Sequence, residues 1–286
     1  MRALVDWPLA QRRQITGVFT DIDDTLTTQG TITPDALAAL DSLRAAGLVV
    51  IAITGRPAGW CEGFMNGSAG APWPVDALVA ENGALAFVPP PAHSTHEKKN
   101  GLQSIWNKRL VLSKIYQLDA KTRATNFKLM SDIAARLLQE MPNLERTRGC
   151  DGRETDIAFD HHEFANLPPE TVAKVVAQLQ AAGLCTSVSS IHIHGCVGLH
   201  TKWTGAQWII RALFGRDLQT ELNHWVFVGD SGNDEAMFEH FTHSVGVANI
   251  SHSAPQMAFL PRYVSALPRG AGFAQVAATL LAARGA

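Results

Sequence analysis

Residues 19–28, FTDIDDTLTT, place three aspartates within four positions, directly behind the apolar pair Val18-Phe19. The apolar, β-branched residues 15–19 (ITGVF) predict a short buried strand that ends where the aspartates begin. Carboxylates held this close together repel one another, and at least one pKa rises unless a cation neutralises them. The stretch therefore predicts a cation-binding site at the end of a buried strand.

The composition indicates a globular protein with one large domain or two ordinary ones. The chain has 286 residues, of which 46% are hydrophobic and 17% charged, so it has ample apolar material for a core. The formal net charge of −2 and the pI of about 6.6 provide no basic field of the kind that binds nucleic acids or anionic membranes. We therefore expect neither a nucleic-acid nor a membrane partner.

The cysteines and the N-terminal segment favour a cytoplasmic location. The four cysteines lie far apart in the sequence and form no CxxC pair, as is typical of free thiols in a reducing cytosol. Residues 1–14 lack the apolar region of a signal peptide, and no run of eighteen apolar residues occurs in the chain. These features predict a soluble cytoplasmic protein.

Residues 15–53 predict a strand, a loop, a helix and a second strand. The helix is expected to begin after the N-cap residue Thr33, with Pro34 in its first position and Gly47 just past its end. The run LVVIAIT at 48–54 is apolar without alternation, as expected of a parallel strand that is covered on both faces. This βαβ order predicts a doubly wound α/β sheet.

The middle of the chain reads as a separate α/β unit. A proline-rich polar stretch at 87–101 interrupts the first pattern, and strands and helices of the first kind resume only after Lys202. The intervening sequence predicts a helix, a strand, a helix and a strand, in that order, at 126–142, 155–160, 168–183 and 185–195. We therefore expect an inserted α/β unit at 87–194 and a core formed by residues 1–86 and 195–286.

Polar residues gather at the predicted carboxyl ends of the core strands, where open parallel sheets bind their ligands. They are Asp21, Asp23 and Asp24 after the first strand, Thr54, Gly55 and Arg56 after the second, Lys202 after the insertion, and residues 229–234 (GDSGND) after the strand HWVFV.

This set of side chains suits a metal ion together with a phosphate group. Converging carboxylates from Asp21, Asp23 and Asp230 are hard oxygen ligands of the kind that Mg²⁺ prefers. The Thr54 hydroxyl and the Lys202 ammonium both suit phosphate oxygens. The sequence therefore predicts a magnesium–phosphate pocket in which a carboxylate can act as a nucleophile.

The chain resembles the haloacid dehalogenase superfamily in four motifs that occur in the same order: Asp21-x-Asp23-x-Thr25, Thr54, Lys202, and Gly229-Asp230-x-x-x-Asp234. Its TGR and GDSGND segments are similar to the Cof-type branch, which includes sucrose-phosphate, mannosyl-3-phosphoglycerate and trehalose-6-phosphate phosphatases. The insertion matches the α/β cap of that branch. The resemblance extends from about Ile15 to the end of the chain and implies a Rossmann-like, doubly wound core with an inserted cap that governs substrate specificity.

The resemblance also implies a role for each motif residue. Asp21 would be the nucleophile that forms an aspartyl-phosphate, and Asp23 the general acid and base. Phosphate binding would fall to Thr54, Gly55, Lys202 and Asn233. The magnesium ligands would be Asp21, Asp230 and the carbonyl of Asp23, with Asp234 supporting the metal or Lys202 from behind. Many members have glycine where this chain has Asp24, which is expected either to face solvent or to cap the turn.

Four further residues are candidate substrate contacts: Arg56, Asn82, His192 and His194. Arg56 is either a surface arginine or faces the substrate, because its loop borders the predicted pocket. His192 and His194 alternate along a predicted strand and therefore share one face. They either bind a transition metal, for which no third ligand has suitable spacing, or face the substrate or solvent.

The sequence thus predicts a magnesium-dependent phosphatase that hydrolyses a small phosphorylated metabolite, most simply a sugar phosphate, through an aspartyl-phosphate. One alternative is a phosphotransferase similar to phosphomannomutase, with the same core. Another is a non-catalytic phospho-sensing module resembling a response-regulator receiver, which the insertion and the extra acid/base at Asp23 disfavour. The identity of the substrate and the oligomeric state are left open.

Overall fold

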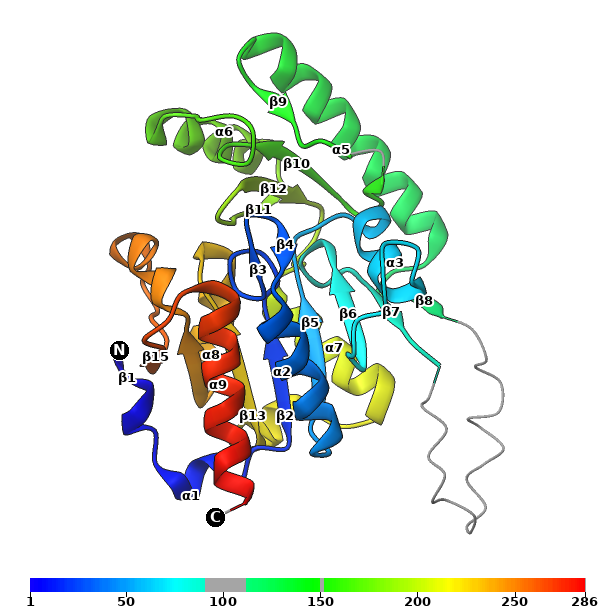
Figure 1. The fold of residues 1–286 in the computed structure, drawn as a ribbon. Coiled ribbons are helices and arrows are strands. Elements are labelled where there is room, and N and C mark those ends of the chain that lie inside the picture. The colour runs from blue at the N-terminus through cyan, green and yellow to red at the C-terminus, as the bar shows by residue number, and fades with distance from the viewer. Residues whose placement is uncertain (91–111, 150–151, 286) are drawn as a thin grey trace.

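The computed structural model describes residues 1–90, 112–149 and 152–285, which form a nine-stranded sheet, a smaller four-stranded sheet and their covering helices (Figure 1). Eight of the nine strands of the larger sheet run in the same direction, and β7 alone runs antiparallel to its two neighbours, β6 and β8. In spatial order they are β1 (Arg2–Ala3), β15 (Tyr263–Val264), β14 (His243–Gly246), β13 (Trp225–Gly229), β2 (Gly17–Thr20), β5 (Val49–Ile53), β6 (Ala77–Ala80), β7 (Leu85–Val88) and β8 (Ser113–Tyr116).

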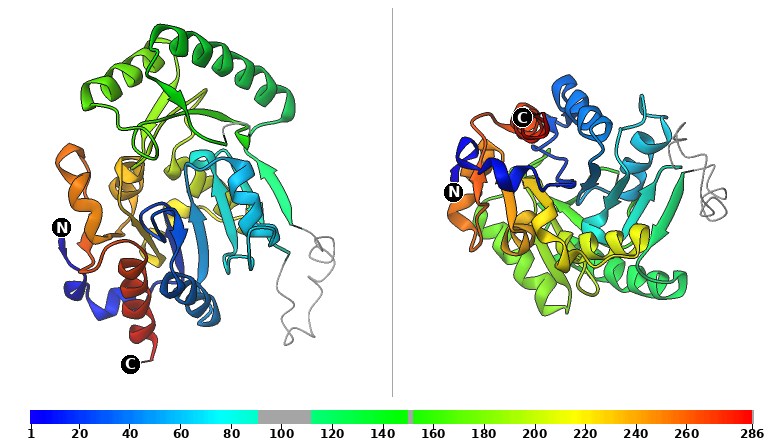
Figure 2. Two further views of the ribbon diagram at one scale, coloured as in Figure 1. Left: turned by 45° about the horizontal axis from the view of Figure 1, so that its top comes forward. Right: turned by 90° about the horizontal axis from the view of Figure 1, so that it is seen from below.

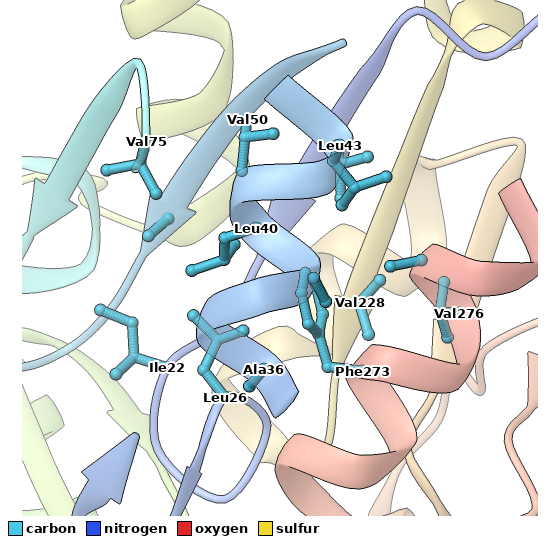
Figure 3. Close-up of a cluster of buried hydrophobic side chains, with 14 of the residues drawn as sticks. Ile22, Leu26, Ala36, Leu40, Leu43, Val50, Val75, Val228, Phe273 and Val276 are labelled. Atoms are coloured by element: carbon cyan, nitrogen blue, oxygen red, sulfur yellow. The ribbon is translucent and has the colours of Figure 1, made fainter. Parts of the chain in front are cut away.

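Helices cover both faces of this sheet, as the doubly wound pattern predicts (Figure 2). One face carries α2 (Pro34–Ala45), α3 (Ala58–Asn66) and α9 (Arg269–Arg284), and the other carries α7 (Lys202–Phe214) and α8 (Glu235–His240). On the first face, Leu40, Val228 and Phe273 belong to one buried apolar cluster (Figure 3). Burial of this apolar surface is the main source of the core's stability.

The start and end signals of α2 are confirmed. Thr33 precedes the helix with an extended backbone, Pro34 is its first residue, and Gly47 follows its end with a φ of +81°. Only glycine adopts this left-handed backbone without steric cost, so the chain can turn here into β5. The turn delivers β5 to the centre of the sheet beside β2.

The small sheet lies beyond the carboxyl ends of the core strands, at the top of Figure 1. Its antiparallel strands, in spatial order, are β11 (Cys185–Val188), β12 (His192–Cys196), β10 (Asp156–Asp160) and β9 (Glu145–Arg146). Two helices pack on its outer face through a separate apolar cluster, namely α5 (Ala120–Glu140) and α6 (Pro169–Ala181). The inner face is thus left to meet the core.

The strand pairing differs from the predicted division, which placed the insertion at 87–194. Strands β7 and β8 extend the core sheet as an antiparallel edge, so the chain leaves the core only after Tyr116. At the other end, β12 continues to Cys196 before the chain returns to the core. Most of the proline-rich segment at 87–101 that suggested the first boundary falls within residues 91–111, which lie outside the described residues.

The predicted single strand at 185–195 is wrong, because β11 and β12 are the two arms of a hairpin. The turn is set by Ser189, whose Oγ accepts a hydrogen bond from the backbone N–H of His192 at 3.0 Å. Serine hydroxyls compete with strand pairing in this way and favour turns. As a result Cys185 and Cys196, which are well separated in the sequence, are direct partners on adjacent strands.

The remaining elements are short. A two-stranded ribbon of β3 (Thr27–Thr28) and β4 (Thr31–Ile32) follows the aspartate loop, and α1 (Leu9–Arg12) precedes β2. Single 3-10 turns are η1 (Leu4–Asp6), η2 (Glu81–Gly83), η4 (Leu218–Thr220), η5 (Leu222–His224), η6 (Gly232–Asp234), η7 (Ala248–His252) and η8 (Ala254–Gln256). Among the described residues, no helix combines the length and the apolar character needed to span a bilayer.

Candidate active site

The predicted motif residues meet at the carboxyl edge of the core sheet. Asp21 directly follows β2, Thr54 follows β5, Asp230 follows β13, and Lys202 opens α7. Strands β13, β2 and β5 are neighbours in the sheet, so the residues that follow them lie at the same edge. The side chains of all four are buried.

Lys202 lies between two buried carboxylates. Its Nζ is 2.5 Å from Asp21 Oδ1 and 2.6 Å from Asp234 Oδ1, and its side chain is 0% exposed. Burial alone would lower the pKa of this lysine, but the charges of Asp21 and Asp234 raise it above its usual value. The ammonium group therefore remains charged and offsets the repulsion between the acids around it.

Asp234 also organises the loop after β13. Its Oδ2 accepts hydrogen bonds from the backbone N–H groups of Asp230, at 2.8 Å, and Ser231, at 3.0 Å. With Oδ1 bound to Lys202, both of its oxygens already have partners. Asp234 therefore fixes the positions of Asp230 and Lys202 through these contacts.

Three carboxylates of this site lie close enough together to surround a metal ion. One oxygen each from Asp21, Asp230 and Asp234 lie within 4.8 Å of one another, which is the sole such group found within residues 1–90, 112–149 and 152–285. Burial raises the pKa of Asp21 to about 7, and burial with the charge of Asp21 raises that of Asp230 well above its usual value. A hard divalent cation suits this all-oxygen donor set and would favour the ionised forms.

Asn249 was missed in the sequence but holds Asp230 in place. Its Nδ2 donates to Asp230 Oδ2 at 2.9 Å and to the carbonyl of Asp24 at 3.0 Å, while its Oδ1 accepts from the backbone of Arg269. Thr25 Oγ1 lies 3.4 Å from the other oxygen of Asp230. The segment that carries Asn249 follows β14, which ends at the same edge of the sheet.

Asp24 has a structural position that the sequence left open. Its φ is +53°, in the left-handed region where glycine is favoured, and its carboxylate lies 2.8 Å from Arg269 Nε at the start of α9. The side chain therefore neither caps the turn nor simply faces solvent. It ties the aspartate loop to α9, and its positive φ is one that glycine adopts without strain.

Arg56 joins the core to the insertion. Its Nε and NH2 lie 2.9 Å from the carboxylate oxygens of Asp23, and its NH1 is 2.8 Å from Glu163 Oε1. Glu163 Oε2 in turn lies 2.7 Å from His192 Nε2. Arg56 is therefore a buried pocket residue and not a surface arginine, and Glu163, in a loop without periodicity, is a site residue that the sequence analysis missed.

His194 is held by a second set of contacts between insertion and core. Its Nδ1 lies 3.1 Å from Asp156 Oδ2, and Asp156 Oδ1 accepts a hydrogen bond from Arg153 NH1 at 2.7 Å. The same NH1 donates to the carbonyl of Gly55 at 3.0 Å. Arg153 and Asp156 were not predicted, since only the fold brings them against the TGR segment.

Two asparagines complete the floor of the site. Asn233 Nδ2 donates to Asn82 Oδ1 at 3.2 Å, and the backbone N–H of Asn82 donates to the carbonyl of Thr54 at 2.9 Å. Asn82 adopts a φ of +53° in the turn after β6. Both side chains are buried beside the motif residues, as expected of groups that contact a bound ligand.

A closed pocket lies between the sheet edge and β12. Its lining joins core motif residues to the hairpin of the insertion: Asp21, Asp23, Thr54, Gly55, Arg56, Ser189, Ser190, His192, His194 and Asn233. A larger cleft of about 510 Å³ beside β11 shares Ser189, Ser190 and Asn233 with it and also reaches Lys202. The predicted shared face of His192 and His194 is observed, and it looks into the closed pocket.

The α/β core and the acidic site at its sheet edge place the chain in a known class of hydrolases. Residues 18–189, more than half of the chain, match the family model described as haloacid dehalogenase-like hydrolase. The chain therefore belongs to the haloacid dehalogenase-like hydrolase family, as the motifs predict. Residues 131–259 also match the model of sucrose-6F-phosphate phosphohydrolase. No curated protein sequence matches the chain significantly.

Solved structures confirm the fold class over almost the whole chain. A Thermoplasma acidophilum protein, 0175, has a TM-score of 0.65 at 16% identity, covering 93% of this chain and 98% of its own. The Synechocystis sucrose-phosphatase in complex with sucrose and phosphate has a TM-score of 0.62 at 16% identity, with coverages of 94% and 98%. The subclass IIB sugar phosphatase BT4131 has a TM-score of 0.55 at 16% identity, with coverages of 87% and 93%. At these identities the likeness establishes the fold alone.

Proposed function

We propose that the protein is a magnesium-dependent phosphatase that hydrolyses a small phosphorylated metabolite, a sugar phosphate, through an aspartyl-phosphate. The observation that carries this proposal is the position of Asp21. It is buried under a closed pocket, 2.5 Å from the ammonium of Lys202 and within metal-sharing reach of Asp230. A carboxylate in such a place is poised to attack a bound phosphoryl group.

In the first step Asp21 attacks phosphorus, and the bond to the leaving oxygen breaks. Asp23 gives its proton to that oxygen, so that a neutral alcohol leaves. In the second step Asp23 takes a proton from water, which attacks the same phosphorus and releases phosphate from Asp21. Because Arg56 holds the Asp23 carboxylate in the closed pocket, the substrate must displace Arg56 before Asp23 can act as an acid.

The remaining core residues bind the phosphoryl group and the metal. Phosphate oxygens would be met by the Thr54 hydroxyl, the Gly55 backbone, the Lys202 ammonium and the Asn233 amide. Asp21, Asp230 and the carbonyl of Asp23 would hold Mg²⁺, while Asp234 is committed to Lys202 and two backbone N–H groups. When bound, Mg²⁺ supplies the positive charge that lets an anionic nucleophile approach an anionic phosphate.

The insertion, from residue 117 to 196, would act as a cap that contacts the leaving group. Its hairpin contributes Ser189, Ser190, His192 and His194 to the pocket, a lining rich in hydrogen-bonding groups. Such a lining suits the hydroxyls of a sugar better than an apolar alcohol. The match to the sucrose-6F-phosphate phosphohydrolase model across 131–259 supports the same substrate class.

A panel of sugar phosphates labelled in the phosphoryl group tests the proposal. With Mg²⁺ present, we expect the label to appear as inorganic phosphate, and Asp21→Asn to prevent its release. Transfer of the label to an added acceptor sugar would instead favour a phosphomannomutase-like phosphotransferase. Failure to release label from any ester of the panel would contradict the proposal.

A further inference from the structure

One ring nitrogen of His194 has a partner and the other has none. Nδ1 lies 3.1 Å from Asp156, whereas the buried Nε2 makes no hydrogen bond with any described residue. The whole side chain is only 3% exposed. A buried polar atom without a partner costs free energy, so such an atom in a pocket points to a ligand group that completes it.

The unpartnered nitrogen faces the core motif residues. A Cβ built on Gly55 would lie 2.9 Å from His194 Nε2 and 3.2 Å from Asn82 Nδ2, so only a glycine leaves room for the ring here. His194 and Gly55 line the same closed pocket as Asp21 and Thr54. The nitrogen therefore borders the space next to the proposed phosphoryl site.

The contacts around the ring determine which nitrogen carries the hydrogen. Asp156 is buried, yet the charge of Arg153 and the hydrogen bond with His194 lower its pKa, so it is a carboxylate that only accepts. Burial lowers the pKa of His194 to about 4, so the ring is neutral. Its single hydrogen must then sit on Nδ1, facing Asp156, and Nε2 presents a lone pair.

The ring is also held rigidly in this state. Arg153 is fully buried and bridges Asp156 and the carbonyl of Gly55, so one residue of the insertion fixes both the carboxylate and its distance from the core. Arg56, the arginine in the pocket lining, has Nε, NH1 and NH2 bound to Asp23 and Glu163. Its positive charge is therefore balanced by two carboxylates, and Glu163 still pairs with it when the substrate displaces Asp23.

We propose that His194 Nε2 accepts a hydrogen bond from a hydroxyl on the carbon next to the ester carbon of the substrate. The site would thus select phosphate esters of polyhydroxy alcohols and disfavour esters that carry a carboxylate or a second phosphate at that place. A hydroxyl donates to the lone pair, whereas an anionic oxygen only accepts and would leave two acceptors facing each other. This inference rests on the proposed phosphatase function and narrows its substrate class.

Three esters that differ at one position test the inference: 2-hydroxyethyl phosphate, ethyl phosphate and phosphoglycolate. For the wild-type chain with Mg²⁺, we expect kcat/KM for the hydroxyethyl ester to exceed that for the ethyl ester by about tenfold or more, with phosphoglycolate lowest. In His194→Ala the ratio between the first two esters should fall towards one. His224→Ala, at the opposite end of β13, is the matched control and should keep the wild-type ratio.

A spectroscopic readout separates hydrogen-bond acceptance from a purely structural role. In long-range ¹H–¹⁵N spectra, with His194→Gln used for assignment, we expect the neutral ring with its hydrogen on Nδ1. Asp156→Asn, which can offer an amide donor to Nδ1, should relax the rejection of phosphoglycolate. A protonated Nε2, or equal wild-type rates for the hydroxyethyl and ethyl esters, would overturn the inference. Hydrolysis of none of the three esters would instead contradict the proposed function.

Discussion

The guanidinium of Arg56 binds the carboxylate of Asp23 through two nitrogens, with distances from 2.9 to 3.1 Å, and reaches Glu163 of the insertion with its third nitrogen. The residue proposed as acid and base is thus linked to the cap by one side chain. A shift of the insertion relative to the core would therefore alter the pairing of Asp23 with Arg56.

The pairing of Glu163 predicts a pH-dependent contribution to stability. Burial disfavours its charged form, but the hydrogen bond with His192 and the charge of Arg56 lower the pKa of Glu163 from 4.5 to about 2. A lowered carboxyl pKa stabilises the fold above the unfolded value, and this contribution is lost as pH falls from about 4.5 through about 2. Above pH 5 we expect Glu163→Gln to reduce the free energy of unfolding by about 1–3 kcal/mol.

Urea unfolding of both chains across this pH range measures the effect. The difference between wild type and Glu163→Gln should shrink steadily below pH 4.5. Glu62→Gln, at an exposed position of α3, is the matched control and should change stability little at any pH. A difference for Glu163→Gln that stays constant with pH would show that the ion pair does not account for it.

Removing the charge of Lys202 is expected to lower the free energy of unfolding substantially. Lys202→Met leaves the buried carboxylates of Asp21 and Asp234 without their shared cation, which typically costs about 3–5 kcal/mol. We expect lower stability in urea and loss of turnover on every phosphate ester. Lys128→Met, in an exposed i,i+4 pair of α5, should cost less than about 1 kcal/mol. Equal midpoints for the two variants would refute this account of Lys202.

The donor set predicts a requirement for Mg²⁺. Removal of divalent ions with EDTA should stop turnover and added Mg²⁺ should restore it, while Zn²⁺ and Ca²⁺ should restore it poorly. Asn249→Ala, which removes the hydrogen bond to Asp230, should raise the Mg²⁺ concentration for half-maximal rate by about 10–100-fold. The exposed Asn223 provides the control substitution to alanine. Full activity in metal-free buffer would exclude the site as described.

We expect turnover to depend completely on the carboxylate of Asp21. In Asp21→Asn the amide cannot attack phosphorus, so we expect an intact fold with no measurable turnover. Asp24→Asn, three residues along the same loop, removes the charge that pairs with Arg269 but no group that would attack phosphorus, so it should retain most of the wild-type rate. Circular dichroism of both variants checks the fold. Retention of more than a few per cent of the wild-type rate by Asp21→Asn would exclude the covalent route.

Much of the core site was predictable because each residue directly follows an apolar strand. Asp21, Thr54 and Asp230 stand where β2, β5 and β13 end, and the parallel order of these strands brings their ends together. Local signals such as Thr33 and Gly47 likewise set the limits of α2. These strands are not consecutive in the sequence, but all three run in the same direction, so the residues that follow them lie at one edge of the sheet.

The insertion was less predictable because its contacts depend on tertiary packing. Glu163 and Arg153 reach the site from loops without periodicity, and their partners Arg56 and Gly55 lie about a hundred residues earlier in the chain. The hairpin turn at Ser189 was hidden because the sequence on both sides favours strands. Local sequence patterns do not predict which loop of the insertion contacts which loop of the core.

Chemical trapping during turnover tests the central claim most directly. Borohydride reduces an acyl phosphate, so an aspartyl-phosphate is converted to homoserine and remains in the chain. With substrate and Mg²⁺ present, peptide mass spectrometry should find homoserine at position 21 and aspartate at position 23. Without substrate, position 21 should remain aspartate. Homoserine at position 23, or at neither position while phosphate is being released, would contradict the account.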